Sequence, residues 1–182
     1  VPGIEKLTKL TNINLSSAET WSDFGPRTIA QKFKPGHFPT PDLSALTNLT
    51  VVNINSDAME TSVKISSTNL STLGVAMAQD GSLPDISGKT ITDLDVNNYT
   101  GDDLSSYLNS ATEIGTLSII GFRGDLDLSE LQFGKSTASY STLNLGADCS
   151  DGDVSINIDS LMATNKNQDI RLTLSTVGNG TL

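Results

Sequence analysis

The stretch LSALTNLTVVNI (residues 43–54) joins two different spacings of apolar residues. Its three leucines lie three positions apart, which is the spacing of a helical or 3₁₀ turn with one apolar side. Val52 and Ile54 then flank the polar Asn53, as the inward-facing residues of a short strand do. The stretch therefore predicts a turn that leads directly into a strand, with the apolar side chains of both directed toward one core.

The strand part of this pattern recurs along the chain as an apolar residue, two others, an apolar residue, one other and a further apolar residue. It starts at positions 10, 49, 70, 91, 114, 140 and 169, at steps of 39, 21, 21, 23, 26 and 29 residues. After the first, these steps fall within the period of leucine-rich repeats, about 20–29 residues. The triplets are Leu10-Ile13-Leu15, Leu49-Val52-Ile54, Leu70-Leu73-Val75, Ile91-Leu94-Val96, Ile114-Leu117-Ile119, Tyr140-Leu143-Leu145 and a weaker Asp169-Leu172-Leu174.

The repeat predicts an α/β solenoid of the leucine-rich-repeat type, with short parallel strands and 3₁₀ or short helical turns on its convex side. We expect one domain over residues 1–182, with about seven degenerate coils. A right-handed β-solenoid is the alternative, because short alternating apolar runs at this spacing occur there too. In either fold, the central apolar column should lie in register and be buried; its clearest members are Leu73, Leu94, Leu117 and Leu143.

Three segments between strands predict the convex side. In residues 102–109, Asp102 or Asp103 stands at the N-cap of a helix whose apolar residues Leu104, Tyr107 and Leu108 share one face. Residues 128–133 and 157–165 have the composition of similar turns.

The composition narrows the possible functions. The formal net charge of -10 disfavours binding to nucleic acid or to anionic membranes. No stretch approaches the roughly 20 apolar residues that span a bilayer. The single cysteine, Cys149, and the single histidine, His37, rule out an intramolecular disulfide and a cysteine-based metal site. We therefore expect a non-catalytic and monomeric chain without a cofactor.

The aspartate-rich residues 148–159 superficially suggest a calcium loop. Counted from Asp151, the sixth and twelfth positions hold Ile156 and Met162, where an EF-hand has glycine and glutamate. Aspartate and glycine are also ordinary residues of tight turns. We expect turn chemistry here and no metal.

Residues 4–15 and 43–54, with LTKLTNINL and LSALTNLTVVNI, resemble the repeats of internalin-like leucine-rich-repeat regions in Gram-positive surface proteins and adhesins. The later units keep only the apolar skeleton, and all seven units lack the asparagine that follows the strand in that family. The resemblance implies an extracellular piece of a longer protein at the bacterial cell wall. It implies an adhesion or recognition module for a host or matrix protein or a glycan. The alternatives are a spacer that presents neighbouring domains and a carbohydrate-active β-solenoid.

The first step of 39 residues contains an insertion near residues 19–41 that is rich in aromatic residues and proline. Aromatic and cationic side chains are the usual anchors of recognition sites. We expect ligand binding here more than on the sheet, although the rings would equally serve to seal the first coil. The candidate binding residues are Trp21, Phe24, Lys32, Phe33, Lys34, His37 and Phe38.

The second candidate site is the concave face of the sheet, which exposes the residues between the buried ones. Its side chains are small and polar, so it suits weak or water-mediated binding. Asp93 and Asp95 on one strand are also the pair that a carbohydrate-active enzyme would use, if a neighbouring strand supplied a further Asp or Lys. The candidate residues of this face are Asn12, Asn14, Asn53, Asn55, Asp93, Asp95 and Asn144.

Overall fold

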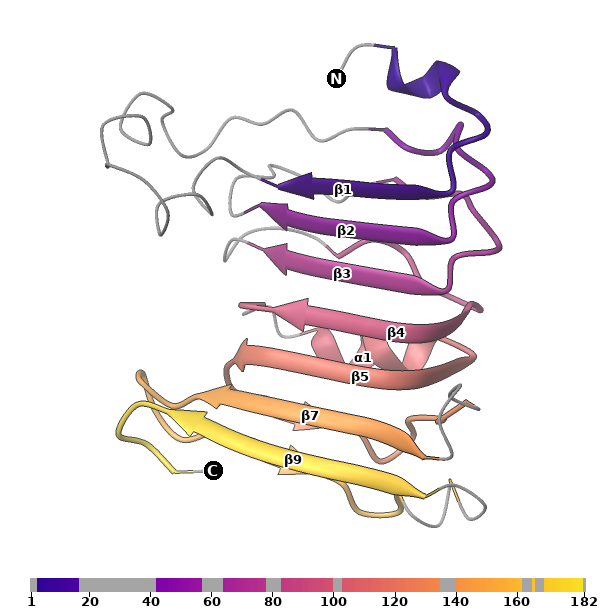
Figure 1. Ribbon diagram of the computed structural model, residues 1–182. Coiled ribbons are helices and arrows are strands. Elements are labelled where there is room, and N and C mark those ends of the chain that lie inside the picture. The colour runs from indigo at the N-terminus through magenta and orange to yellow at the C-terminus, as the bar shows by residue number, and fades with distance from the viewer. Residues whose placement is uncertain are drawn as a thin grey trace, which may run out of the picture.

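The computed structural model describes residues 3–16, 42–56, 64–77, 83–99, 103–134, 140–161, 165 and 169–181. Its main element is a seven-stranded sheet in the order β1-β2-β3-β4-β5-β7-β9, and all neighbouring strands are parallel (Figure 1). The strands are β1 (Asn12–Ser16), β2 (Val51–Ser56), β3 (Thr72–Met77), β4 (Thr90–Asn97), β5 (Glu113–Phe122), β7 (Ser141–Asp148) and β9 (Ile170–Val177). Spatial order follows chain order, as expected for successive repeats.

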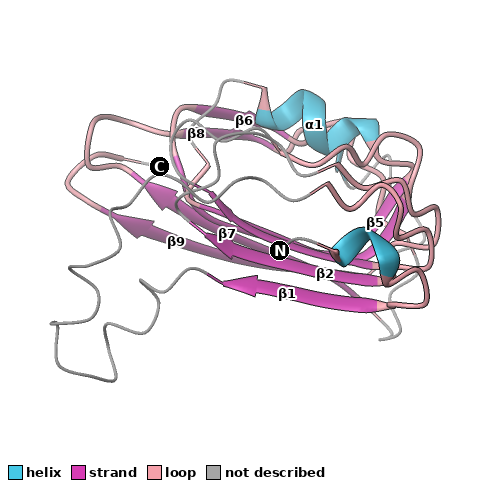
Figure 2. Ribbon diagram, turned by 90° about the horizontal axis from the view of Figure 1, so that it is seen from above, coloured by secondary structure: helices cyan, strands magenta, loops and turns pink. Residues whose placement is uncertain are grey.

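A second, thinner layer lies behind one face of this sheet (Figure 2). It contains helix α1 (Leu104–Ser110) and a two-stranded parallel sheet of β6 (Asp125–Asp127) and β8 (Ser155–Asn157). A short 3₁₀ helix, η1 (Ile4–Lys6), precedes β1. The chain is therefore an α/β structure with a dominant parallel sheet and few helices.

The strand register confirms the predicted apolar column. Leu73 pairs with Leu94, Leu94 with Leu117, and Leu117 with Leu143. All four side chains are 0% exposed. The position two residues later repeats the arrangement on these four strands and on β2, and its buried members are Ile54, Val75, Val96, Ile119 and Leu145.

The segments that lead from one strand of the large sheet back to the start of the next, which we call the return segments, contain successive tight turns. The Leu46 N–H donates to the Leu43 carbonyl at 2.9 Å, and the Leu49 N–H donates to the Leu46 carbonyl at 3.2 Å. The predicted turn at residues 128–133 has the same bond from Leu131 to Leu128, at 3.1 Å. Bonds between residues three apart place every third side chain on one side, and all five of these leucines are buried.

An Asp-x-Ser turn begins three of these segments, a feature that the sequence analysis missed. The carboxylates of Asp42, Asp85 and Asp127 each accept the N–H of the serine two residues later, at 2.9 Å. This aspartate turn fixes the bend at which the chain leaves one unit and folds back behind the sheet. Hydrogen bonds from the serine lower the pKa of each of these carboxyl groups.

Helix α1 forms where it was predicted, with Asp103 at the N-cap and with Leu104 and Leu108 buried. The predicted capping hydrogen bond is absent, however, because the Asp103 carboxylate accepts the hydroxyl of Tyr99 instead. Asp102 lies outside the described residues.

The last strand differs from the other six. Leu172 and Leu174 of β9 are in register with the buried Leu143 and Leu145, yet they are 41% and 50% exposed. Among the described strands, β9 is last in the sheet order and pairs with β7 alone. The weakest sequence repeat is thus also the least buried one.

Candidate ligand-binding face

The side of the large sheet away from the core carries a grid of polar side chains, which we call the polar face. Its residues alternate with the buried ones along each strand, and the parallel register aligns them from strand to strand. The polar side chains of the described residues on this face are Asn12, Asn14, Asn53, Thr72, Asp93, Asp95, Asn97, Thr116, Ser118, Thr142, Asn144, Arg171, Thr173 and Ser175.

Six of the seven sheet residues predicted from the sequence lie on the polar face. The side chains of Asn12, Asn14, Asp93 and Asp95 are exposed, and those of Asn53 and Asn144 are partly buried. Asn55 pairs with Ala76 in the register, but its side chain is outside the description. The predicted insertion residues Trp21, Phe24, Lys32, Phe33, Lys34, His37 and Phe38 also lie outside the described residues.

Several of these polar groups interact with each other across the strands. The Asn144 side-chain amide donates to the Ser118 hydroxyl at 3.4 Å, and Ser118 also forms a hydrogen bond with Asp95. These contacts link β4, β5 and β7. Farther along the face, the Asn53 amide lies above Gly74, where a Cβ would be only 2.5 Å from the Asn53 oxygen.

Asp95 is the carboxyl group on this face whose pKa is raised. Partial desolvation against the sheet is the main cause, and repulsion from Asp93 adds to it, while the Ser118 hydrogen bond acts in the opposite direction. The residues beside the pair on the neighbouring strands are Thr72 and Gly74 on β3 and Thr116 and Ser118 on β5. None of these four in-register neighbours is the further Asp or Lys that the carbohydrate-active alternative calls for beside the pair.

An aromatic and a cationic side chain meet where β7 and β9 begin. The Arg171 guanidinium carbon lies 4.1 Å from the centroid of the Tyr140 ring. Such a pair combines a flat apolar surface with a positive charge. The sequence analysis placed Tyr140 in a repeat but missed this contact, because the two residues are brought together only by the register of β7 and β9.

Three aspartates of the segment 148–159, which superficially suggested a calcium loop, form hydrogen bonds with other residues of the chain. Arg123 donates from Nε and Nη2 to the Asp148 carboxylate, at 2.9 and 2.6 Å, and from Nη1 to Asp151. Asp153 accepts the Thr181 N–H at 2.9 Å. Hydrogen bonds from Ser150 and Arg123 lower the pKa of Asp148 to about 2. Within the described ranges, no group of three or more His, Cys, Asp or Glu side chains is arranged to hold a metal ion.

Cys149 is buried, and its thiol lies 3.6 Å from the Thr181 carbonyl oxygen, to which it donates. It packs as a small apolar residue. Among the residues that the structure describes, no helix is long and apolar enough to cross a membrane.

Comparisons of the chain with protein-family models, with curated proteins and with solved structures returned no significant match. The polar face and its contacts are the observations from which a function can be proposed.

Proposed function

We propose that this chain is a non-catalytic recognition module of a bacterial surface protein, exposed outside the cell, which binds a host or matrix protein or a glycan. The observation that carries the proposal is the division of strands β3, β4, β5 and β7 into a buried apolar side and a polar side. The side chains of the sheet's inward column, Leu73, Leu94, Leu117 and Leu143, are completely buried. Its other side offers aligned amide, hydroxyl and carboxylate groups on consecutive strands.

The finer fold that we propose is a leucine-rich-repeat solenoid. Steps of 21 to 29 residues, one strand per step and tight turns in the return segments all support it. The β6–β8 pair is a local departure from this fold. These two return segments pair with each other as strands, as return segments would in a β-solenoid.

The chemistry of the polar face suits a ligand that is rich in hydroxyl or amide groups. Asn, Ser, Thr and Asp side chains exchange hydrogen bonds with such groups directly or through water. The face has few large apolar anchors, so we expect the aromatic residues of the insertion to provide most of the contact area. Tyr140 with Arg171 offers a smaller aromatic surface where β7 and β9 begin.

A spacer that holds neighbouring domains apart is the second candidate, and one observation favours it. The contacts of Ser118 with Asp95 and Asn144 satisfy part of the polar face internally, so fewer groups remain for a ligand. The Asp93–Asp95 pair gives the third candidate, a carbohydrate-active β-solenoid, no such support.

The test is binding of the full chain to an array of glycans and extracellular-matrix proteins. We expect selective capture by a small set of ligands. Uniform failure to bind would contradict the recognition proposal and favour the spacer.

A pair of variants then locates the binding site. Phe33→Ala with Phe38→Ala should weaken capture while the melting temperature stays nearly unchanged. Thr142→Ala with Asn144→Ala tests the polar face in the same way, and we expect a smaller loss. Unfolding of the N-terminal units in the phenylalanine variant would instead identify the insertion as a structural cap.

A further inference from the structure

The turn that follows β9 contains Asn179 and Gly180, the one asparagine–glycine pair of the sequence. In such a pair, the backbone nitrogen of the glycine can attack the side-chain carbonyl carbon of the asparagine. The attack is least hindered before glycine, because glycine has no Cβ to obstruct the approach. Asn179 is exposed, so water reaches its side chain. Its sequence neighbour and its exposure both make Asn179 chemically open to modification.

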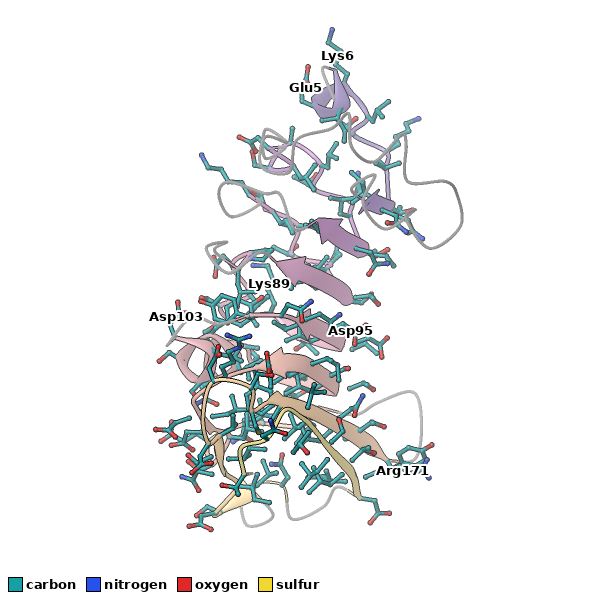
Figure 3. All side chains as sticks on the ribbon, turned by 90° about the vertical axis from the view of Figure 1, so that its left-hand side faces the viewer. Glu5, Lys6, Lys89, Asp95, Asp103 and Arg171 are labelled. Carbon is teal, nitrogen blue, oxygen red and sulfur yellow. The ribbon has the colours of Figure 1, made fainter. Side chains whose placement is uncertain are left out.

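The backbone around this pair is held against another loop. Residues 177–181 pack against residues 149–153, the loop that follows β7, and we call this contact the clasp (Figure 1). The Thr181 N–H donates to the Asp153 carboxylate at 2.9 Å. Figure 3 views the molecule from the side on which the clasp lies, and the pale yellow segment after β9 is at the end opposite Lys6. The clasp thus joins the units of β7 and β9 beyond the ends of their strands.

Gly180 lies within the clasp at a point where no side chain fits. Its N–H donates to the Cys149 carbonyl at 3.0 Å. A Cβ on Gly180 would lie 2.8 Å from that same carbonyl oxygen, and the Gly152 carbonyl oxygen would be closer still. Both oxygens belong to the backbone, so neither can rotate away. The close packing requires glycine at this position, and the same glycine leaves Asn179 open to attack.

The clasp also restrains the attacking nitrogen. Attack requires the Gly180 nitrogen to give up its proton and to reach the side-chain carbonyl carbon of Asn179. In the closed clasp that N–H is bonded to Cys149, and the bonds of Val177 and Thr181 fix the backbone on either side. The reaction therefore needs a local opening, which a surface turn undergoes more easily than a central strand.

We propose that Asn179 is a site of spontaneous deamidation, with water as the only co-reactant, and that opening of the clasp sets its rate. The Gly180 nitrogen bonds to the side-chain carbonyl carbon of Asn179, and the side-chain nitrogen leaves as ammonia with the proton from Gly180. Water then opens the cyclic succinimide to aspartate or to isoaspartate. This proposal does not depend on the recognition function.

Both products weaken the clasp. The new carboxylate stands close to the exposed Asp151 and Asp153, and like charges repel each other. Arg123, which could offset the added charge, is already paired with Asp151. Isoaspartate also adds one carbon to the backbone before Gly180, which displaces the N–H groups of Gly180 and Thr181 from their acceptors. Modification at Asn179 should therefore destabilise the contact between the two units.

The rate test compares the full chain with the free peptide STVGNGTL, residues 175–182, in the same neutral buffer. Peptide mapping by mass spectrometry measures the loss of the amide at each asparagine. We expect Asn179 to convert first among the asparagines of the folded chain, at a rate at least about tenfold below that of the peptide, since the clasp is open for only a small part of the time. Equal rates in chain and peptide, or earlier conversion of another asparagine, would overturn the proposal.

A pair of aspartate variants tests whether the clasp sets the rate. Asp153→Ala removes the acceptor of the Thr181 N–H and should speed the conversion of Asn179 severalfold. Asp159→Ala is the matched control, because Asp159 is exposed just after β8 and lies outside the clasp. It should leave the rate unchanged. Circular dichroism verifies that both variants are folded, and equal rates in the two would show that the clasp does not control the reaction.

The effect of the product is measured without waiting for the reaction. Asn179→Asp reproduces one product and should melt at a lower temperature than the native chain, and high salt should reduce the difference because it screens the added charge. Asn179→Gln keeps the neutral amide and should melt close to the native chain. If Asn179→Asp melts no lower than Asn179→Gln, the product does not weaken the clasp and that part of the proposal is wrong.

Discussion

Leu94 and Leu117 occupy the middle of the inward column, with a paired strand on both sides and no exposed surface. Replacing either by alanine should destabilise the protein by about 2–5 kcal/mol, because the substitution removes buried apolar atoms and leaves a cavity. Chemical denaturation measures this loss. Thr116→Ala, on the opposite side of the same strand as Leu117, is the control and should change stability far less. Equal losses for the two sides would show that the sheet is not divided as described.

The lowered pKa of the Asp148 carboxyl group leads us to expect that the folded protein loses stability in acid. Its pKa falls from the ordinary 3.8 to about 2 in the folded chain, where Ser150 and Arg123 stabilise the charged form. A depressed folded pKa contributes stability that is complete above about pH 4 and is lost as the pH falls toward 2. The melting temperature of the native chain should therefore drop over this range.

Asp148→Asn isolates this contribution. The variant should melt lower than the native chain near neutral pH, and its melting temperature should fall less between pH 4 and pH 2. Part of the acid sensitivity should remain, since the pKa values of Asp42, Asp85, Asp127 and Asp153 are also lowered by hydrogen bonds. Parallel pH profiles for the two proteins would refute the assignment.

At the scale of the strand, two glycines test how closely neighbouring units approach each other. A Cβ on Gly115 of β5 would lie 2.7 Å from the backbone carbonyl oxygen of Thr92 in β4. A Cβ on Gly74 of β3 would instead meet only the mobile end of the Asn53 side chain. Gly115→Ala should cost about 1–3 kcal/mol, because backbone must shift to relieve the overlap.

Gly74→Ala provides the comparison within the same sheet. The Asn53 amide can rotate away, so we expect a change of no more than about 0.5 kcal/mol. Denaturant titration of both variants measures the difference. If Gly74→Ala proves the more damaging substitution, the packing between adjacent strands is not as described.

The strands could be predicted from the sequence, whereas the contacts between the return segments could not. A side-chain period of two fixes which residues of a short strand face inward, so the triplet around Leu94 gives both its face and its register. The Asp-x-Ser motifs at Asp42, Asp85 and Asp127 are visible in the sequence. Such short motifs are common in a chain rich in Asp and Ser, so they do not by themselves identify a turn. The pairing of β6 with β8 follows no apolar pattern that a strand search would detect.

The candidate site, too, could be predicted only in part from the sequence. Positions of the polar face followed from the alternation along each strand. The pairing of Tyr140 with Arg171, and that of Arg123 with Asp148, join residues that are 25 or more positions apart and belong to different units. Local spacing carries no information about such contacts, because they depend on how far one unit is offset from the next.

Considered as a whole, the described molecule is a linear stack in which the strands of the large sheet lie side by side in chain order (Figure 1). Stability in such an arrangement is a sum of nearest-neighbour terms. Among the described strands, the central ones pair with a neighbour on both sides, and β9 pairs on one side. We expect amide hydrogen exchange to be slowest in β4 and β5 and fastest in β9.

The central claim is that successive repeats place Leu73, Leu94, Leu117 and Leu143 side by side in one column. Nuclear Overhauser effects between selectively labelled leucine methyl groups test it most directly. The account predicts strong effects from Leu73 to Leu94, from Leu94 to Leu117 and from Leu117 to Leu143, with none between Leu73 and Leu143. Absence of the Leu94–Leu117 effect, or a direct effect between Leu73 and Leu143, would contradict the account.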